Sequence, residues 1–338
     1  MLLAACLLPF GAACFFDADL PLQNDSPSCT NRSEIKATLL YPESSVCTLS
    51  ISDRNDSMVS LSAVPGNAMT GDGLSYDSLS IPWPGRYEFL STGYGVKLLH
   101  LLLDTNRMGR YNGILLLQDA ASATLRIPYD IEKKFIDPFD TSPLSDDVWE
   151  SYVTDDSLHL GFDYIDGKLA FTFRRSDDTL HAPLSTGIRS RFSLPSSFFA
   201  TVDFKLRDEM DEAFEVGFFI SSSSDTGRWA GGQAGIFISG VNGRLRFECR
   251  SINLQSYSYE TSVVAGELGM ARTDSTITYY LHDGNPAVVP LPLTFQTYPA
   301  EVPVYMHLKM IVRDLSKDRN CYWNDFTVPE GLISFAAQ

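Results

Sequence analysis

Positive charge is scarce in this sequence. Its 338 residues include 26 Lys and Arg against 42 Asp and Glu, which gives a formal net charge of -16. A chain of this charge repels a phosphate backbone, and no Lys/Arg-rich stretch offers a local exception. We therefore expect no nucleic-acid partner.

Spacings typical of catalytic and metal sites are also lacking. The five histidines form no H-x-x-x-H or H-E-x-x-H pair, and the serines form no G-x-S-x-G turn. We predict no catalytic residue, no cofactor and no metal centre built on histidine or cysteine. One structural ion stays open: acid-rich turns could bind calcium through Asp77, Asp163 or Asp166.

No apolar run beyond residue 16 reaches the ~20 residues that a spanning helix needs. Residues 1–16, MLLAACLLPFGAACFF, are typical of the end of a signal peptide. Small residues precede Cys6 and Cys14, as in the lipobox of bacterial lipoproteins, and we favour Cys14 as the lipidated residue. A cleaved signal without lipid is the alternative. We expect an exported protein, periplasmic, outer-membrane-anchored or extracellular, that contacts a membrane only through this lipid.

Export bears on the other cysteines. An oxidising compartment would allow one disulfide in each half of the chain, Cys29 with Cys47 and Cys249 with Cys321. Free thiols, with Cys249 as a small buried residue, are the alternative. No C-x-x-C spacing indicates zinc or a redox site.

The domain organisation follows from β-favouring runs separated by turn residues. Residues 17–33 have the Pro, Asn, Asp and Ser content of a linker. Runs such as EIKATLLY and VKLLHLLL, without an 11-residue helical pattern, predict a small β-sandwich over residues 34–130, with a barrel as the alternative. A Pro- and acid-rich stretch then indicates the start of a second domain over residues 131–338.

Alternation of polar and apolar residues is the clearest signal in the second domain. In TVDFKLR the apolar side chains alternate with Asp203, Lys205 and Arg207, and GRLRFECR and VYMHLKMIVR alternate likewise, with Ile311 as an exception. Each strand therefore has a buried face and a wetter face. Two stacked sheets bury the apolar faces, and turns such as YIDGK and GVNGR supply the Gly and Asn/Asp residues that hairpins need.

At this point the second domain resembles a known family. The segments that carry the resemblance are PFDTSPLSDDVWE, LAFTFRR, ATVDFKLRDEMDEAFEVGFFIS and MIVRD…CYWNDFTVPEGLISF. They are similar to concanavalin A-like lectin/glucanase domains of exported bacterial proteins, from Phe135 to Phe335. The resemblance implies a jelly-roll sandwich of two curved antiparallel sheets, and in many relatives the concave face binds sugar. With the small N-terminal β-sandwich before it, we expect the whole chain to be all-β.

Glycanases of this fold carry E-x-D-x-E or E-x-D-x-x-E on one strand, which places alternate carboxylates on one face. The segment EMDEAFE, residues 209–215, invites comparison with that motif. Ala213 and Phe214 stand where the third acid should fall, and we expect a solvated acidic turn between two strands there.

Sugar binding needs aromatic faces for ring C–H groups and planar polar groups for hydroxyls. The side chains that fit this description are Trp229, Arg246, Glu248, Tyr257, Tyr259, Tyr305 and His307. A purely structural role is the alternative for each, and for His307 it is that of a surface histidine without function.

These observations favour a non-catalytic surface or periplasmic protein whose lectin-like domain binds a glycan or cell-surface polymer. One alternative is a structural or adhesive envelope protein that binds other proteins. The other is a glycoside hydrolase or lyase whose carboxylates are dispersed over several strands. The sequence leaves the oligomeric state open.

Overall fold

The computed structural model describes residues 34–52, 58–65, 85–93, 96–103, 105–119, 124–140, 144–154, 159–175, 183–195, 197–206, 214–222, 233–241, 244–253, 255–261, 263–282, 289–299 and 301–335. These residues form strands and turns and contain no helix, so that no helical membrane span occurs among them. Several predicted features lie outside the described residues: the signal segment with Cys6 and Cys14, the linker, Cys29, Asp77 and Trp229.

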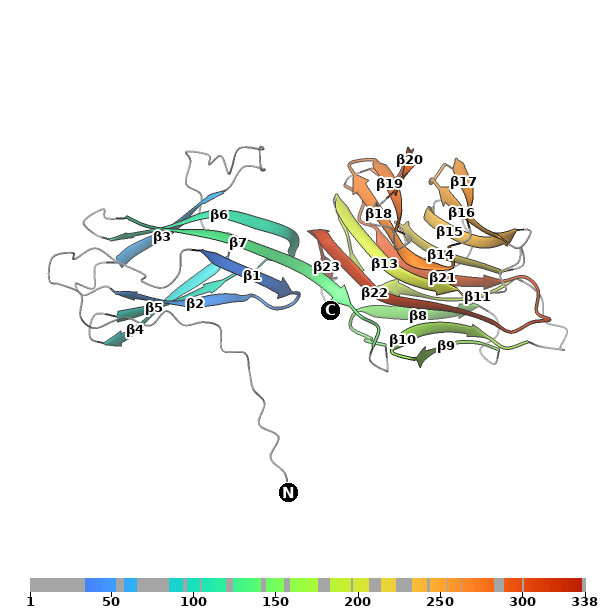
Figure 1. Cartoon of the computed structure of the whole chain (residues 1–338), viewed down its shortest axis with the longest axis horizontal. Coiled ribbons are helices and arrows are strands. Elements are labelled where there is room, and N and C mark those ends of the chain that lie inside the picture. The colour runs from blue at the N-terminus through green and yellow to red at the C-terminus, as the bar shows by residue number, and fades with distance from the viewer. Residues whose placement is uncertain are drawn as a thin grey trace, which may run out of the picture. The chain divides into compact units, whose positions relative to one another are not determined.

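The chain divides into two compact units, the first ending at Lys134 and the second beginning at Phe135. One sheet of the first unit contains, in order, β1 (Ile35–Leu40), β7 (Thr124–Asp137), β6 (Arg107–Asp119) and β3 (Met58–Pro65). The other contains β2 (Ser45–Ser52), β5 (Val96–Leu102) and β4 (Arg86–Gly93). Figure 1 shows these strands in blue to green.

An apolar cluster draws on both sheets of the first unit. Its buried members are Ile35, Leu39, Leu49, Leu99, Leu101, Leu103, Leu115, Ile127, Tyr129 and Ile131. Burial of such side chains is the main favourable contribution to folding. The small sandwich predicted for this unit and its boundaries at residues 34 and 130 stay predictions.

Two sheets make up most of the second unit (Figure 1). The β13 sheet has the order β9 (Leu160–Ile165), β10 (Lys168–Phe173), β22 (Arg319–Leu332), β13 (Phe198–Leu206), β18 (Ala265–Thr273), β19 (Thr276–His282) and β20 (Val289–Gln296). The β14 sheet has the order β17 (Ser256–Thr261), β16 (Arg244–Arg250), β15 (Ala234–Val241), β14 (Phe214–Ser221), β21 (Tyr305–Val312), β11 (Leu184–Ser190) and β8 (Trp149–Thr154). A short pair joins β12 (Phe192–Ser193) to β23 (Ser334–Phe335).

Ring contacts show that the two sheets stack face to face. Phe204 of β13 lies 5.8 Å from Phe247 of β16, and Phe218 of β14 lies 6.3 Å from Phe326 of β22, centroid to centroid. All four side chains are buried, as the period-two alternation requires of core-facing positions. The predicted fold class, an all-β chain with a two-sheet jelly-roll sandwich in its second part, is confirmed.

Two expectations about individual residues are corrected by this architecture. His307 and Lys309, expected on a wetter face of β21, are 0% and 1% exposed. Cys249 and Cys321 are both buried free thiols. The disulfide predicted between Cys249 and Cys321 is absent because these residues belong to different sheets, where each packs as a small apolar side chain.

Close packing between strands leads to a prediction at Gly235 of β15. A Cβ atom there would lie 2.2 Å from the Cβ of Phe219 and 2.5 Å from the carbonyl oxygen of Phe218. We expect Gly235→Ala to lower the free energy of unfolding by about 1–3 kcal/mol, since neither neighbour can move cheaply. Gly161→Ala on β9, whose nearest neighbour is 4.0 Å away, serves as the control and should be neutral or slightly stabilising. Equal urea midpoints for both variants would contradict the packing.

Candidate functional site

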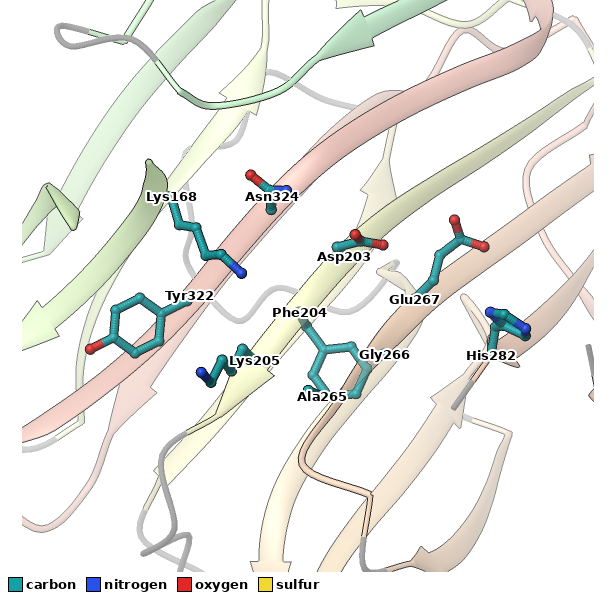
Figure 2. A pocket seen from close by; sticks show the side chains of 10 residues that line it. All are labelled: Lys168, Asp203, Phe204, Lys205, Ala265, Gly266, Glu267, His282, Tyr322 and Asn324. Carbon is teal, nitrogen blue, oxygen red and sulfur yellow. The ribbon is translucent and has the colours of Figure 1, made fainter. Parts of the chain in front are cut away.

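A row of polar side chains crosses the outer face of the β13 sheet, the face opposite the core. Asn324, Asp203, Glu267 and His282 lie directly opposite one another in register on β22, β13, β18 and β19. Lys168 of β10 borders Asn324 (Figure 2). The alternation that buries Phe204 thus brings Asp203 beside Glu267, with Cβ atoms about 4.5–5.5 Å apart as in any directly opposed antiparallel pair.

This row lies in an open pocket of about 320 Å³. The residues that line this pocket, called the Asp203 pocket below, are Lys168, Asp203, Phe204, Lys205, Ala265, Gly266, Glu267, His282, Tyr322 and Asn324. In Figure 2 the two carboxyl groups occupy its middle, between the lysines and Tyr322 on one side and His282 on the other. Carboxylates, an imidazole and an aromatic ring therefore face the same solvent-open space.

Local backbone features position this row. Asp166 and Gly167 both have positive φ, 54° and 71°, so that the predicted Asp-Gly hairpin forms the tight turn that leads directly into Lys168. Asp325, with φ of 44°, follows Asn324 at a register irregularity between β13 and β22. Such bulges reorient neighbouring side chains and are common next to active sites.

The surroundings of Asp203 raise the pKa of its carboxyl group. Partial burial, together with the negative charges of Glu267 and Asp325, raises the pKa of Asp203 to about 6. The positive charges of Lys168 and His282 oppose this rise without cancelling it. Asp203 therefore holds a proton in mildly acidic solution, as a general acid must.

The outer face of the β14 sheet, called the polar face below, holds four of the residues predicted to bind sugar. Arg246 and Glu248 lie there on β16, and Tyr305 and His307 lie there on β21. Two others are separated from them: Tyr257 and Tyr259 lie opposite the core-facing residues of β16, on the other side of the sheet. Whether any of these side chains binds sugar stays a prediction.

Aromatic packing closes the polar face around His307. Its ring stacks on Phe219, with centroids 4.6 Å apart and planes 8° apart, and its Nε2 atom is 2.8 Å from the Ser221 hydroxyl oxygen. Burial lowers the pKa of His307 to about 3, helped by the positive charges of Arg189 and Lys309. The interpretation of His307 as a surface histidine is therefore wrong: it is a buried neutral imidazole.

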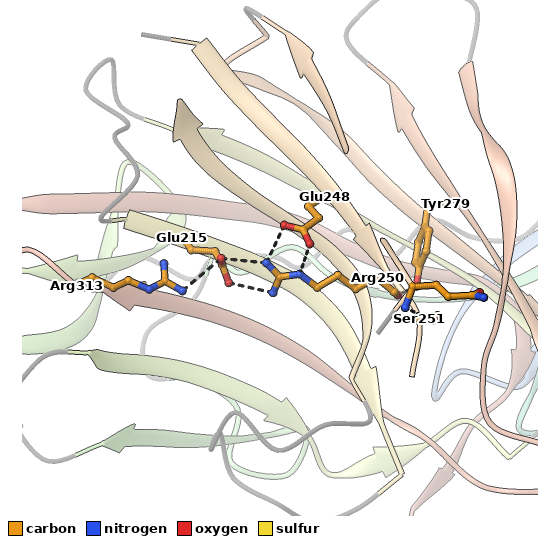
Figure 3. A network of polar contacts seen from close by, with 7 residues as sticks. Glu215, Glu248, Arg250, Ser251, Tyr279 and Arg313 are labelled. Atoms are coloured by element: carbon orange, nitrogen blue, oxygen red, sulfur yellow. Dashed lines mark hydrogen bonds and ion pairs between the residues drawn. The ribbon is translucent and has the colours of Figure 1, made fainter. Parts of the chain in front are cut away.

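Ion pairs occupy the acidic groups of the polar face. Arg250 lies between Glu215 and Glu248, and Arg313 contacts Glu215 from the other side (Figure 3). The hydrogen bond and charge of Arg250 lower the pKa of Glu248. Glu248 is therefore held ionised and is a poor proton donor.

Glu215 also corrects the interpretation of EMDEAFE. Rather than lying in a solvated turn, Glu215 belongs to β14 and is 5% exposed, while residues 207–213 lie outside the described ones. Gly217 and Phe219 occupy the next two positions on the same face. The single-strand carboxylate motif of glycanases is therefore not present on β14.

Metal ligands do not converge in the part of the chain that the structure describes: no three His, Cys, Asp or Glu side chains there could hold an ion. Asp166 forms the hairpin turn, and the Asp163 carboxylate accepts a hydrogen bond from the backbone N–H of Tyr164. The calcium expectation gains no support at these two residues.

Sequence reasoning did not identify the Asp203 pocket. It placed Asp203 and Lys205 correctly on the polar side of their strand. It did not find Glu267, because AGELGMA lacks a clear alternation and nothing in one sequence tells which residue of β18 pairs with Asp203. The turn signal at Asp166 and Gly167 was the one local clue to the position of Lys168.

No protein-family model matches this sequence, and no curated protein sequence matches it. Among solved structures, a laminarinase from Flavobacterium sp. UMI-01 is similar at 12% identity with a TM-score of 0.44, covering 57% of this chain and 97% of its own. An endo-β-1,3-glucanase from Pyrococcus furiosus is similar at 10% identity with a TM-score of 0.42, covering 58% of this chain and 94% of its own. Peanut lectin is similar at 10% identity with a TM-score of 0.41, covering 61% of this chain and 99% of its own.

These structures include both glucanases and a lectin, the two kinds of protein in the family that the second domain resembles. Glucanases are the more frequent kind among them. This finding contradicts the leading expectation of a non-catalytic glycan-binding protein, and the alternative of a hydrolase with dispersed carboxylates agrees with it better. The reaction itself is inferred below from the residues of this chain alone.

The ion-pair network of the polar face leads to a stability prediction. We expect Arg250→Met to lower the free energy of unfolding by roughly 3 kcal/mol, because it leaves the buried Glu215 carboxylate with Arg313 as its one arginine partner among the described residues. Arg244→Met, an exposed arginine on the same strand, is the control and should change it by less than about 0.5 kcal/mol. Chemical denaturation measures the free energy of unfolding of both variants. An Arg250→Met variant as stable as the unaltered protein would refute the stabilising role of the Arg250 ion pairs.

The raised pKa of Asp203 leads to a second prediction. The unfolded chain has the ordinary aspartate pKa near 3.9. The native state binds this proton more tightly, so stability falls as pH rises from about 4 to 6. We expect Asp203→Asn to stabilise the protein by about 1 kcal/mol at pH 7.5, after allowance for solvent screening, and to have no such effect below pH ~4. Thermal unfolding of both proteins across this pH range tests the prediction. A gain in stability that is the same at both ends of the range would contradict it.

Proposed function

We propose that the chain is a glycoside hydrolase in which Asp203 is the general acid and Glu267 is the nucleophile. The observation that carries this proposal is the cross-strand pair of carboxyl groups in an open pocket, with no arginine of the described residues paired to either. Glycosidic bonds are cleaved by such pairs, one protonated and one ionised. The pair also matches the expectation of carboxylates dispersed over different strands.

The separation of the two groups favours a mechanism with retention of configuration. Retaining enzymes hold their carboxyl groups about 5–5.5 Å apart, whereas inverting enzymes leave about 6.5–9.5 Å for a water molecule. In a directly opposed antiparallel pair the Cβ atoms are about 4.5–5.5 Å apart, so the two carboxyl groups can approach to the shorter distance. The register between β13 and β18 therefore supports a covalent intermediate over direct attack by water.

The steps follow from these roles. Asp203 donates its proton to the glycosidic oxygen while the Glu267 carboxylate attacks the anomeric carbon; the glycosidic C–O bond breaks and a glycosyl ester forms. Asp203, now ionised, takes a proton from water, and the resulting hydroxide attacks the anomeric carbon and releases Glu267. Asn324 and His282, at either side of the pair, are placed to bind sugar hydroxyls.

The proposal is tested with the full-length chain and a panel of neutral β-glucans and acidic glycans, by following the release of reducing ends. We expect Asp203→Asn and Glu267→Gln each to lower kcat/KM by about a hundred- to ten-thousand-fold. In the unaltered protein kcat/KM should fall as pH rises above about 6, because Asp203 then loses the proton that it must donate.

Glu132→Gln, an exposed glutamate of the first unit, is the matched control and should retain full activity. Unaltered activity in both pocket variants, or no cleavage anywhere in the panel, would refute the proposal. Products with a carbon–carbon double bond, seen by their ultraviolet absorbance, would instead identify a lyase.

A further inference from the structure

The Asp203 pocket has two ends of different charge. Lys168 extends from β10 and Lys205 from β13, and in Figure 2 both lie on the same side of Asp203 as Tyr322, away from Glu267. Register explains the position of Lys205, which is directly opposite Tyr322 on β22. Two ammonium groups and an aromatic ring thus share the end of the pocket beyond the reacting pair.

Neither of these lysines is bound to a carboxylate of the described residues. By contrast, Lys36 contacts Glu34 at 2.9 Å and Lys134 contacts Glu132 at 3.8 Å. In a chain with 16 more acidic than basic residues, an ion-pair partner for a surface lysine is easily supplied. Two unpaired ammonium groups in one pocket are therefore available to a negatively charged group of a ligand.

The net charge of -16 does not prevent such binding. Charges on the surface are screened over a Debye length of about 8 Å at physiological ionic strength, so that distant carboxylates contribute little inside the pocket. The two lysines, the carboxyl pair, Asp325 and His282 set the local field. The lysines would hold an anionic group away from Glu267, which must stay close to the anomeric carbon.

From this arrangement we infer that the pocket takes a glycan with a carboxylate or sulfate group on a sugar beside the cleaved bond. Lys168 and Lys205 bind this group, and Tyr322 packs against its sugar ring. The inference rests on the proposed function, because that function places the cleaved bond at Asp203 and Glu267. It adds the substrate class, an acidic glycan, which neither the fold nor the carboxylate pair specifies.

Binding to the full-length Asp203→Asn protein, measured by calorimetry, separates recognition from cleavage. The probes are three oligosaccharides of equal length: one of uronic acids, one sulfated and one neutral. We expect at least one acidic probe to bind ten-fold or more tightly than the neutral one. Adding Lys168→Met and Lys205→Met should remove this preference, whereas Lys36→Met with Lys134→Met, the same change of charge in the first unit, should leave it intact.

Each outcome bears on the inference. Tighter binding of the uronate or of the sulfated probe tells which anion is recognised and supports it. Equal binding of all three probes, no binding of either acidic probe, or a preference that survives loss of both pocket lysines overturns it, even if the unaltered protein cleaves neutral glucans. Lysine-dependent binding of an acidic glycan that the unaltered protein leaves uncut would support the inference and refute the proposed hydrolase.

Discussion

The stacking of two sheets on their apolar faces is the constraint on which the second unit depends. Phe204 against Phe247 and Phe218 against Phe326 fix which side of each strand is buried. Because side chains alternate along a strand, the polar residues between them must lie on the outer faces. Register across strands then decides which polar side chains become neighbours.

The two outer faces use their carboxyl groups in different ways. On the polar face, Glu215 and Glu248 share Arg250, and Glu150 pairs with Arg189. An arginine partner stabilises the ionised form of a carboxyl group and so contributes to folding at neutral pH. In the Asp203 pocket, partial burial and the like charge of Glu267 have the opposite effect: they raise the pKa of Asp203, which costs stability and leaves a proton available for chemistry.

Local signals in the sequence predicted a good part of this structure. TVDFKLR alternates as expected, and Asp166 with Gly167 forms a hairpin turn because both residues tolerate positive φ. The polarity of His307 was a poor guide, since a polar residue can be buried when an aromatic ring such as Phe219 covers it. Polarity reports the face of a strand; exposure depends on what packs against that face.

The sequence by itself determined the fold class and, for the strands that alternate clearly, the polar and the apolar side, because these follow from a period of two and from turn residues a few positions apart. Only the tertiary structure decided that Asp203 lies beside Glu267 rather than beside an arginine, and that Cys249 and Cys321 belong to different sheets. The physical reason is that register and stacking are set by contacts between residues tens of positions apart. A pattern of residues along one chain does not tell which of these distant residues become neighbours in space.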